Sequence, residues 1–87
     1  MSEPVKVTEQ QMKQISICHE VCDERAEQDA KWGGPEHDDH HNPRDWVQYI
    51  DKRLSNITFE MKDARDEFIK VAALAVAAIE TIDRKAK

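Results

Sequence analysis

Apolar side chains recur every three or four residues in the first part of the chain, which is the spacing of one face of an α-helix. They are Met12, Ile15, Cys18, Cys22 and Ala26. Thr8 and Gln11 have the spacing of a capping box, in which each side chain bonds the other residue's backbone N–H. Gly33 can take the left-handed conformation that follows a helix, and Pro35 prevents continuation. The pattern predicts a helix over residues 8–31 after a short tail, residues 1–7.

A second helix is predicted over residues 43–55, after a loop that holds both glycines and three of the four histidines, residues 32–42. Asn42 can cap this helix, and Pro43 suits its first turn. Its apolar face holds Trp46, Ile50 and Leu54. The polar pair Ser55-Asn56 favours a break, after which Thr58 would cap a third helix; one kinked, continuous helix is the alternative.

The third helix is predicted over residues 58–84, and its segment 71–79 is apolar on every side. Five of these nine residues are alanine. Such a segment should be buried on several sides, with small side chains that let helices approach closely. One chain of 87 residues has few helices to enclose it, so we expect a homo-oligomer. The sequence predicts one all-α domain, residues 1–87: a small bundle of three helices with the alanine-rich C-terminal helix at its centre.

The charge and the hydropathy pattern narrow the class of protein. The net charge is −5, with 18 acidic and 13 basic residues, so direct DNA binding is not expected. The first 14 residues are polar and no apolar run approaches the roughly 20 residues that cross a bilayer. We therefore expect a cytoplasmic protein with no membrane partner, in which Cys18 and Cys22 stay reduced.

One face of the first predicted helix is acidic, because Glu20, Glu24 and Glu27 lie at helical spacing. Helical bundles gather carboxylate oxygens around a divalent ion in this way, and Mg²⁺ needs only one or two such ligands beside substrate phosphates. The alternative is a solvated charged face, interleaved with Arg25 and Lys31. Spacing alone favours that alternative.

The predicted loop places carboxylates and imidazoles within five residues, His37-Asp38-Asp39-His40-His41. This mixture suits Mn, Fe or Zn as well as Mg, and Asp38 or Asp39 could act as a base beside a metal-bound water. The alternative is a polar loop with capped turns. Cys18 and Cys22 with His37 and His41 would give a zinc set, but the spacings match no standard zinc module, so zinc is the least favoured ion.

Trp32 follows two cationic residues, Arg25 and Lys31, near the end of the first predicted helix. An indole, a guanidinium and an ammonium beside an acidic metal site could hold a base and phosphates. These three residues are the candidate nucleotide-binding set. The alternative is that Trp32 closes the core while the cations pair with glutamates.

Three segments, residues 23–33, 37–39 and 68–84, resemble small uncharacterised proteins of bacteriophages and prophages. Those carry a Glu-Arg-x-x-Gln…Trp-Gly…His-Asp-Asp pattern, here from Glu24 to Asp39, and an alanine- and valine-rich closing helix. Some of them resemble the all-α (MazG-like) nucleoside triphosphate pyrophosphohydrolases. The resemblance implies a helical oligomer in the cytoplasm of a bacterial host. It also implies Mg²⁺ held by an E-x-x-E and an E-x-x-D motif.

The residues match these motifs in part. Glu24 and Glu27 fit the first motif by spacing, and Glu67 takes the glutamate position of the second, but Lys70 stands where the aspartate would be. Two further pairs fit the second motif by spacing only: Glu60 with Asp63, and Glu80 with Asp83. The resemblance therefore supports a role in nucleotide binding better than it supports catalysis.

The preferred interpretation is a protein that binds a nucleotide or a host-defence component and has no demonstrable catalytic motif. A metal-dependent nucleoside triphosphate pyrophosphohydrolase is the alternative, with its catalytic residues unassigned, and a zinc-stapled helical interaction module is the second alternative. Mg²⁺ or Mn²⁺ would suit the candidate metal ligands, which are Glu20, Glu24, Glu27, His37, Asp38, Asp39 and Glu67. They form one site only if residues 37–41 fold back over the acidic face of the first helix.

Overall fold

The structure is a computed structural model that describes residues 6–57 and 60–86. Over these residues the chain forms helices and no strand, which confirms the all-α class expected from the sequence. The helices are α1 (Glu9–Trp32), α2 (Gly34–Asp38), α3 (Pro43–Ser55) and α4 (Met61–Lys85). Thr58, expected to cap the last helix, lies outside the described residues.

Local side-chain contacts begin and end the helices. The side chain of Thr8 accepts from the Gln11 N–H and that of Gln11 accepts from the Thr8 N–H, so the capping box is present. Asn42 and Asp45 make the same reciprocal pair at the start of α3. Since α3 ends at Ser55 and α4 begins separately, the predicted break is confirmed and the continuous kinked helix is wrong.

The segment predicted as a loop contains a short helix, α2. Gly33 and Gly34 have φ values of 106° and 67°, a left-handed conformation that glycine adopts without the steric cost of a Cβ. Two such residues turn the chain sharply out of α1. Pro35, whose ring fixes a helical φ, then starts a new turn, which is why residues 34–38 are helical rather than irregular.

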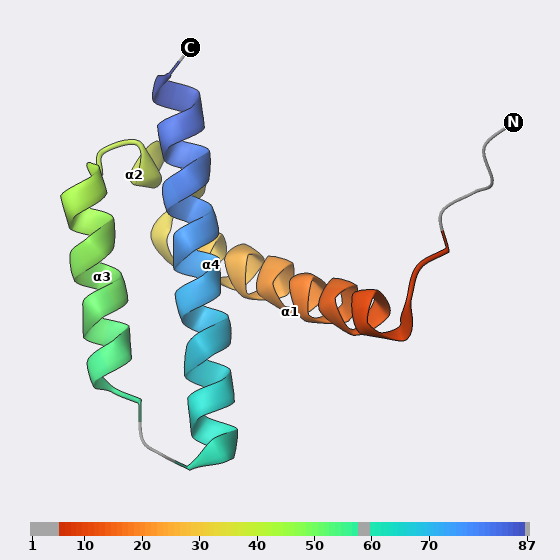
Figure 1. The fold of residues 1–87 in the computed structure, drawn as a ribbon. Coiled ribbons are helices and arrows are strands. Elements are labelled where there is room, and N and C mark those ends of the chain that lie inside the picture. The colour runs from red at the N-terminus through yellow and green to blue at the C-terminus, as the bar shows by residue number, and fades with distance from the viewer. Residues whose placement is uncertain (1–5, 58–59, 87) are drawn as a thin grey trace, which may run out of the picture.

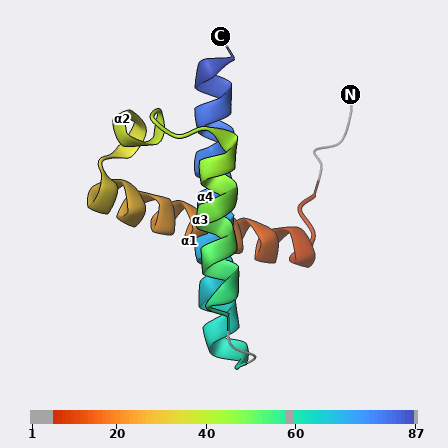
Figure 2. The same ribbon diagram turned by 90° about the vertical axis from the view of Figure 1, so that its left-hand side faces the viewer.

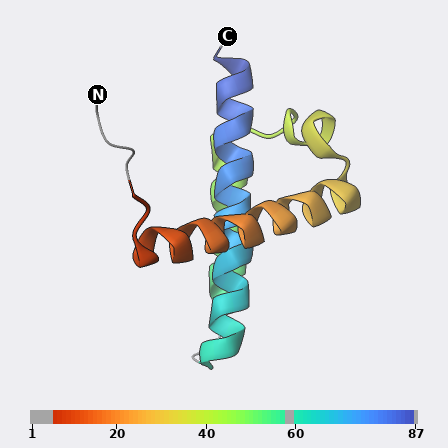
Figure 3. The ribbon, with the colours of Figure 1, turned by 90° about the vertical axis from the view of Figure 1, so that its right-hand side faces the viewer.

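The alanine-rich helix α4 is central, as predicted: α1, α2 and α3 all pack against it. Figure 1 shows α3 antiparallel beside α4, and Figure 2 shows the two helices aligned one behind the other. Figure 3 shows α1 crossing α4 steeply, with both of its ends projecting beyond α4. The radius of gyration is 15.6 Å, whereas a compact domain of this length would have about 12 Å. The single chain is therefore an open arrangement of helices.

The core lies between α3 and α4. Trp46, Leu74 and Ala77 form a buried cluster, against which Ile50 and Ala78 pack. Ala73 and Ala77 are 0% and 1% exposed, so the small side chains of α4 sit where the other helices come closest. The close approach expected from the alanines is present on this side of the helix.

The opposite side of α4 is exposed. Val76 and Ile79 are 38% and 57% exposed, so the expectation that segment 71–79 is buried on several sides is wrong for one chain. The reason is geometric: every described helix that packs on α4 leaves this face uncovered. The apolar side chains do not make a membrane span, since no helix in the described ranges is long and apolar enough to cross a bilayer.

Candidate ligand cavity and metal group

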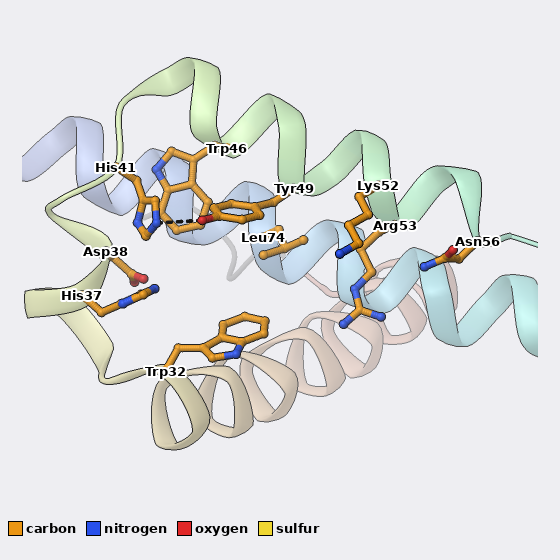
Figure 4. A pocket seen from close by; sticks show the side chains of 10 residues that line it. All are labelled: Trp32, His37, Asp38, His41, Trp46, Tyr49, Lys52, Arg53, Asn56 and Leu74. Atoms are coloured by element: carbon orange, nitrogen blue, oxygen red, sulfur yellow. Dashed lines mark hydrogen bonds between the residues drawn. The ribbon is translucent and has the colours of Figure 1, made fainter.

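A cavity of about 430 Å³ lies between the C-terminal end of α1, the segment 37–41 and α3, with Leu74 of α4 at its base (Figure 4). Its volume falls in the range of small-molecule sites, roughly 300–1,000 Å³. The residues around it come from all four helices and the connections between them. They are Trp32, His37, Asp38, His41, Trp46, Tyr49, Lys52, Arg53, Asn56 and Leu74.

Aromatic rings line two opposing sides of this cavity. Trp32 extends from the last residue of α1, and Tyr49 and Trp46 face it from α3 (Figure 4). Trp46 and Tyr49 pack edge to face with centroids 6.1 Å apart, so the α3 side is a fixed wall. Trp32 is 41% exposed and makes no aromatic pair with any described residue. The cavity is therefore lined by aromatic side chains from both α1 and α3.

Cationic side chains lie at one end of the cavity. Lys52 and Arg53 belong to the last turn of α3, where positive charge also stabilises the helix dipole. Within the described ranges, Lys52 makes no ion pair, and Arg53 makes one, with 3.8 Å between its Nη1 and Oε2 of Glu67. That separation is too long for a hydrogen bond. The donors of both residues are therefore available to an anion in the cavity.

The other end holds His37, Asp38 and His41, whose potential ligand atoms all lie within 4.8 Å of one another. This is the one such group of three or more among the described residues. Asp38 is 5% exposed and its Oδ2 accepts a hydrogen bond from Nη2 of Arg25 at 3.3 Å. His41 approaches the Tyr49 hydroxyl, with 3.0 Å between Nε2 and Oη. We call this set the His–Asp–His group.

Arg25, a predicted nucleotide ligand, lies in the interior and does not line the cavity. It is 9% exposed and its guanidinium contacts three carboxylates. The N–O distances are 2.9 Å to Asp29, 3.3 Å to Asp38 and 3.5 Å to Glu80. Its donors are thereby used to connect α1 with α2 and α4. Lys31 borders a separate hollow, so Trp32 alone of the three predicted residues reaches the cavity.

The acidic face of α1 lies along a different hollow, shared with Arg65 and Lys70 of α4. Arg65 donates from both terminal nitrogens to the Glu20 carboxylate. These hydrogen bonds, and then the guanidinium charge, hold the pKa of Glu20 below its ordinary value, and the same contact raises the pKa of Arg65. Glu24 and Glu27 border this hollow and also a third one, which reaches Trp32 and Arg53.

The candidate metal ligands therefore do not form one site. Glu20, Glu24 and Glu27 line hollows that contain none of the His–Asp–His group. Asp39 is directed elsewhere, since its Oδ1 accepts from Nε of Arg84 at 2.8 Å. His37 and Asp38 are the two predicted ligands that the structure brings together.

The magnesium site implied by the resemblance does not fit the residues around Glu67. Lys70 replaces the aspartate of the second motif, and its Nζ lies 3.7 Å from Oε1 of Glu67. Arg53 approaches the other carboxylate oxygen, and Arg65 holds Glu20. Side-chain cations thus already neutralise Glu67 and Glu20, whereas Glu24 and Glu27 of the first motif make no ion pair among the described residues.

His41 is absent from the predicted metal ligands, although the sequence places it in the metal-suited segment 37–41 and in a zinc set with Cys18 and Cys22. Both cysteines are exposed on α1 and neither belongs to the His–Asp–His group. Lys52 and Arg53 were missed as well, because a basic last turn is also what a helix C-terminus favours.

Comparisons with protein-family models, with curated proteins and with solved structures found no match for this chain. The resemblance to phage proteins and to the pyrophosphohydrolases therefore stays a prediction from sequence patterns.

Proposed function

We propose that the protein binds a planar organic anion of the nucleotide type in the cavity between α1 and α3. The observation that carries the proposal is the position of Trp32 opposite Tyr49 and Trp46, with two cations beside them (Figure 4). Stacking of a base on aromatic side chains contributes about 1–3 kcal/mol per base. Arginine adds a bidentate pairing with phosphate or carboxylate oxygens.

In this proposal the ring of the ligand lies between Trp32 and Tyr49. The anionic group pairs with Arg53 and Lys52 at the end of α3, and the Asn56 amide offers one donor and one acceptor group nearby. Leu74 at the base of the cavity is buried, and the accessible apolar surface belongs to Trp32 and Tyr49, which are 41% and 44% exposed. Displacing water from these two rings adds hydrophobic stabilisation to binding.

Binding without turnover is favoured over pyrophosphohydrolysis. That reaction would need a divalent ion on the carboxylates near the phosphates, and Glu67 is instead approached by Arg53 and Lys70. A protein of this kind would act by sequestering its nucleotide. If the phage resemblance holds, that nucleotide would belong to the host or to its defence.

We also propose that two copies of the chain associate through α4. Its exposed face carries an alternating four- and three-residue repeat, which is the spacing of a helix–helix seam. The repeat consists of Phe68, Ala72, Ala75, Ile79 and Ile82. Phe68, Ile79 and Ile82 are each 47–57% exposed, and the open shape of the single chain leaves the face accessible. A second copy would bury it and complete the bundle.

The test is a thermal-shift screen of nucleoside mono- and triphosphates and cyclic dinucleotides, with and without Mg²⁺, followed by chromatography of the incubated nucleotide. A ligand that binds the native state alone raises the Tm by mass action. We expect a rise with at least one nucleotide, which is recovered intact. Trp32→Ala should abolish the rise, whereas Val47→Ala, on the exposed side of α3, should keep it. No rise with any nucleotide would reject the proposal, and cleavage products would favour the pyrophosphohydrolase.

A further inference from the structure

We propose that His37, Asp38 and His41 bind one late first-row divalent ion, of the Zn²⁺, Co²⁺ or Ni²⁺ type, at the α2 end of the cavity. Two imidazoles and one carboxylate form a nitrogen-rich set that suits these ions better than Mg²⁺, which prefers oxygen ligands. All three ligand atoms already lie within 4.8 Å of one another. Its three ligands are different residues from the aromatic and cationic side chains proposed to hold a nucleotide, and none of them lies on the acidic face of α1.

The ring of His41 supplies the strongest evidence. Its Nε2 lies 3.0 Å from the Tyr49 hydroxyl, while its Nδ1 is buried and has no hydrogen-bond partner among the described residues. A buried polar atom without a partner costs free energy. Metal-bound histidines usually bind through one ring nitrogen and bond the other N–H to a neighbouring group. His41 has this arrangement, with Nδ1 left for the ion and Nε2 facing Tyr49.

Asp38 has the second feature of a metal ligand, which is an outer partner that fixes its orientation. Its side chain is 7% exposed, and Oδ2 accepts from Nη2 of Arg25 at 3.3 Å. The other oxygen, Oδ1, accepts no hydrogen bond within the part of the chain that the structure describes. A carboxylate that lies beside two imidazoles, with one oxygen held by arginine, is positioned to bind an ion.

His37 completes the set from the exposed side. Its ring lies edge to face against that of His41, with centroids 4.8 Å apart, and both rings border the cavity (Figure 4). Three protein ligands leave at least one coordination position open on a zinc-type ion. That position would accept a water or a donor atom of a molecule in the cavity.

Isothermal titration with Zn²⁺ and Co²⁺ alone, without nucleotide, tests the site. A Cys18→Ser/Cys22→Ser background removes the exposed thiols as competing ligands. We expect one ion per chain and visible Co²⁺ absorption bands, with no comparable response to Mg²⁺. His37→Gln should weaken binding by about tenfold or more, while His40→Gln, its exposed neighbour outside the group, should leave affinity unchanged. Because His37 is exposed, its substitution should leave the fold intact, which circular dichroism checks.

The absence of Zn²⁺ and Co²⁺ binding to the folded protein would overturn the proposal. So would equal losses in His37→Gln and His40→Gln, since the ion would then be held by the histidine-rich segment in general. Neither result would contradict the proposed nucleotide site, because Trp32, Tyr49 and the two cations of α3 are not ligands of the ion.

Discussion

Arg25 and Asp38 form a buried ion pair, in which Nη2 lies 3.3 Å from Oδ2 and neither residue is more than 9% exposed. The pair joins α1 to α2 across thirteen residues of sequence. Arg25 also contacts Glu80 of α4, so one guanidinium connects three helices. Since Asp38 belongs to the His–Asp–His group, the same contact supports the fold and orients a candidate ligand.

Replacing Arg25 with alanine should strongly destabilise the protein. The substitution leaves the Asp38 carboxylate buried without its cation, a change that costs about 3–5 kcal/mol when a buried pair is broken. For a domain this small, that is a large part of the free energy of unfolding. Urea unfolding measures the difference. Arg65→Ala is the control, because it breaks an exposed pair with Glu20 and should have a much smaller effect; equal losses would contradict the role given to Arg25.

The Arg65–Glu20 contact should appear in the titration of Glu20. Arg65 holds the pKa of this carboxyl below its ordinary value. The pair therefore contributes stability above the ordinary glutamate pKa, about 4.3, and the contribution is lost as the pH falls through the folded-state pKa. A carbon-13 NMR titration should show the pKa of Glu20 rising in Arg65→Ala and unchanged in Arg44→Ala. An identical pKa in the wild type and in Arg65→Ala would show that the contact does not persist in solution.

Two arginines of α3 give a matched test of the anion-binding end of the cavity. Arg53 lines the cavity, whereas Arg44, exposed in the first turn, does not. Either substitution by glutamine removes one positive charge, so the change in net charge is the same. We expect Arg53→Gln to weaken nucleotide binding about tenfold, the loss of one charged hydrogen bond, and Arg44→Gln to change it little. Equal effects would point to general charge attraction instead of a specific contact.

The α4 seam predicts a concentration-dependent dimer. Ile79→Glu places a charge within the repeat and should convert the protein to a monomer, as measured by analytical ultracentrifugation. Val47→Glu adds the same charge at a more exposed position on α3, 64% against 57%, and should leave the dimer intact. A wild-type protein that stays monomeric at high concentration would reject the seam.

Local chemistry made the helix ends predictable from the sequence. Thr8 with Gln11, and Gly33 after α1, act through contacts within a few residues. The crossing of α1 over α4 depends instead on contacts such as Arg25 with Glu80, which are 55 residues apart. A short-range pattern carries no information about that pairing.

The same limit applies to the candidate site. The spacing of His37 and His41 is visible in the sequence, but the partner of His41 is Tyr49, on the next helix. For Arg25 the sequence left open a ligand or a pairing with glutamates: Asp29 lies one helical turn away, but only the fold brings Asp38 and Glu80 to its guanidinium. The replacement of the motif's aspartate by Lys70, in contrast, is visible in the sequence, and the structure places its Nζ 3.7 Å from Oε1 of Glu67.

The indole N–H signals of the protein report most directly on the proposed ligand cavity. The chain has two tryptophans, and both line the cavity. Each of the two indole N–H signals in a nitrogen-15 NMR spectrum therefore comes from a residue of the cavity wall. During titration with ATP, GTP or a cyclic dinucleotide, we expect the Trp32 signal to shift saturably and that of Trp46 to follow with the same affinity. If none of these ligands moves either signal in the folded protein, or if only residues around Glu20 and Arg65 respond, the cavity is not the nucleotide site.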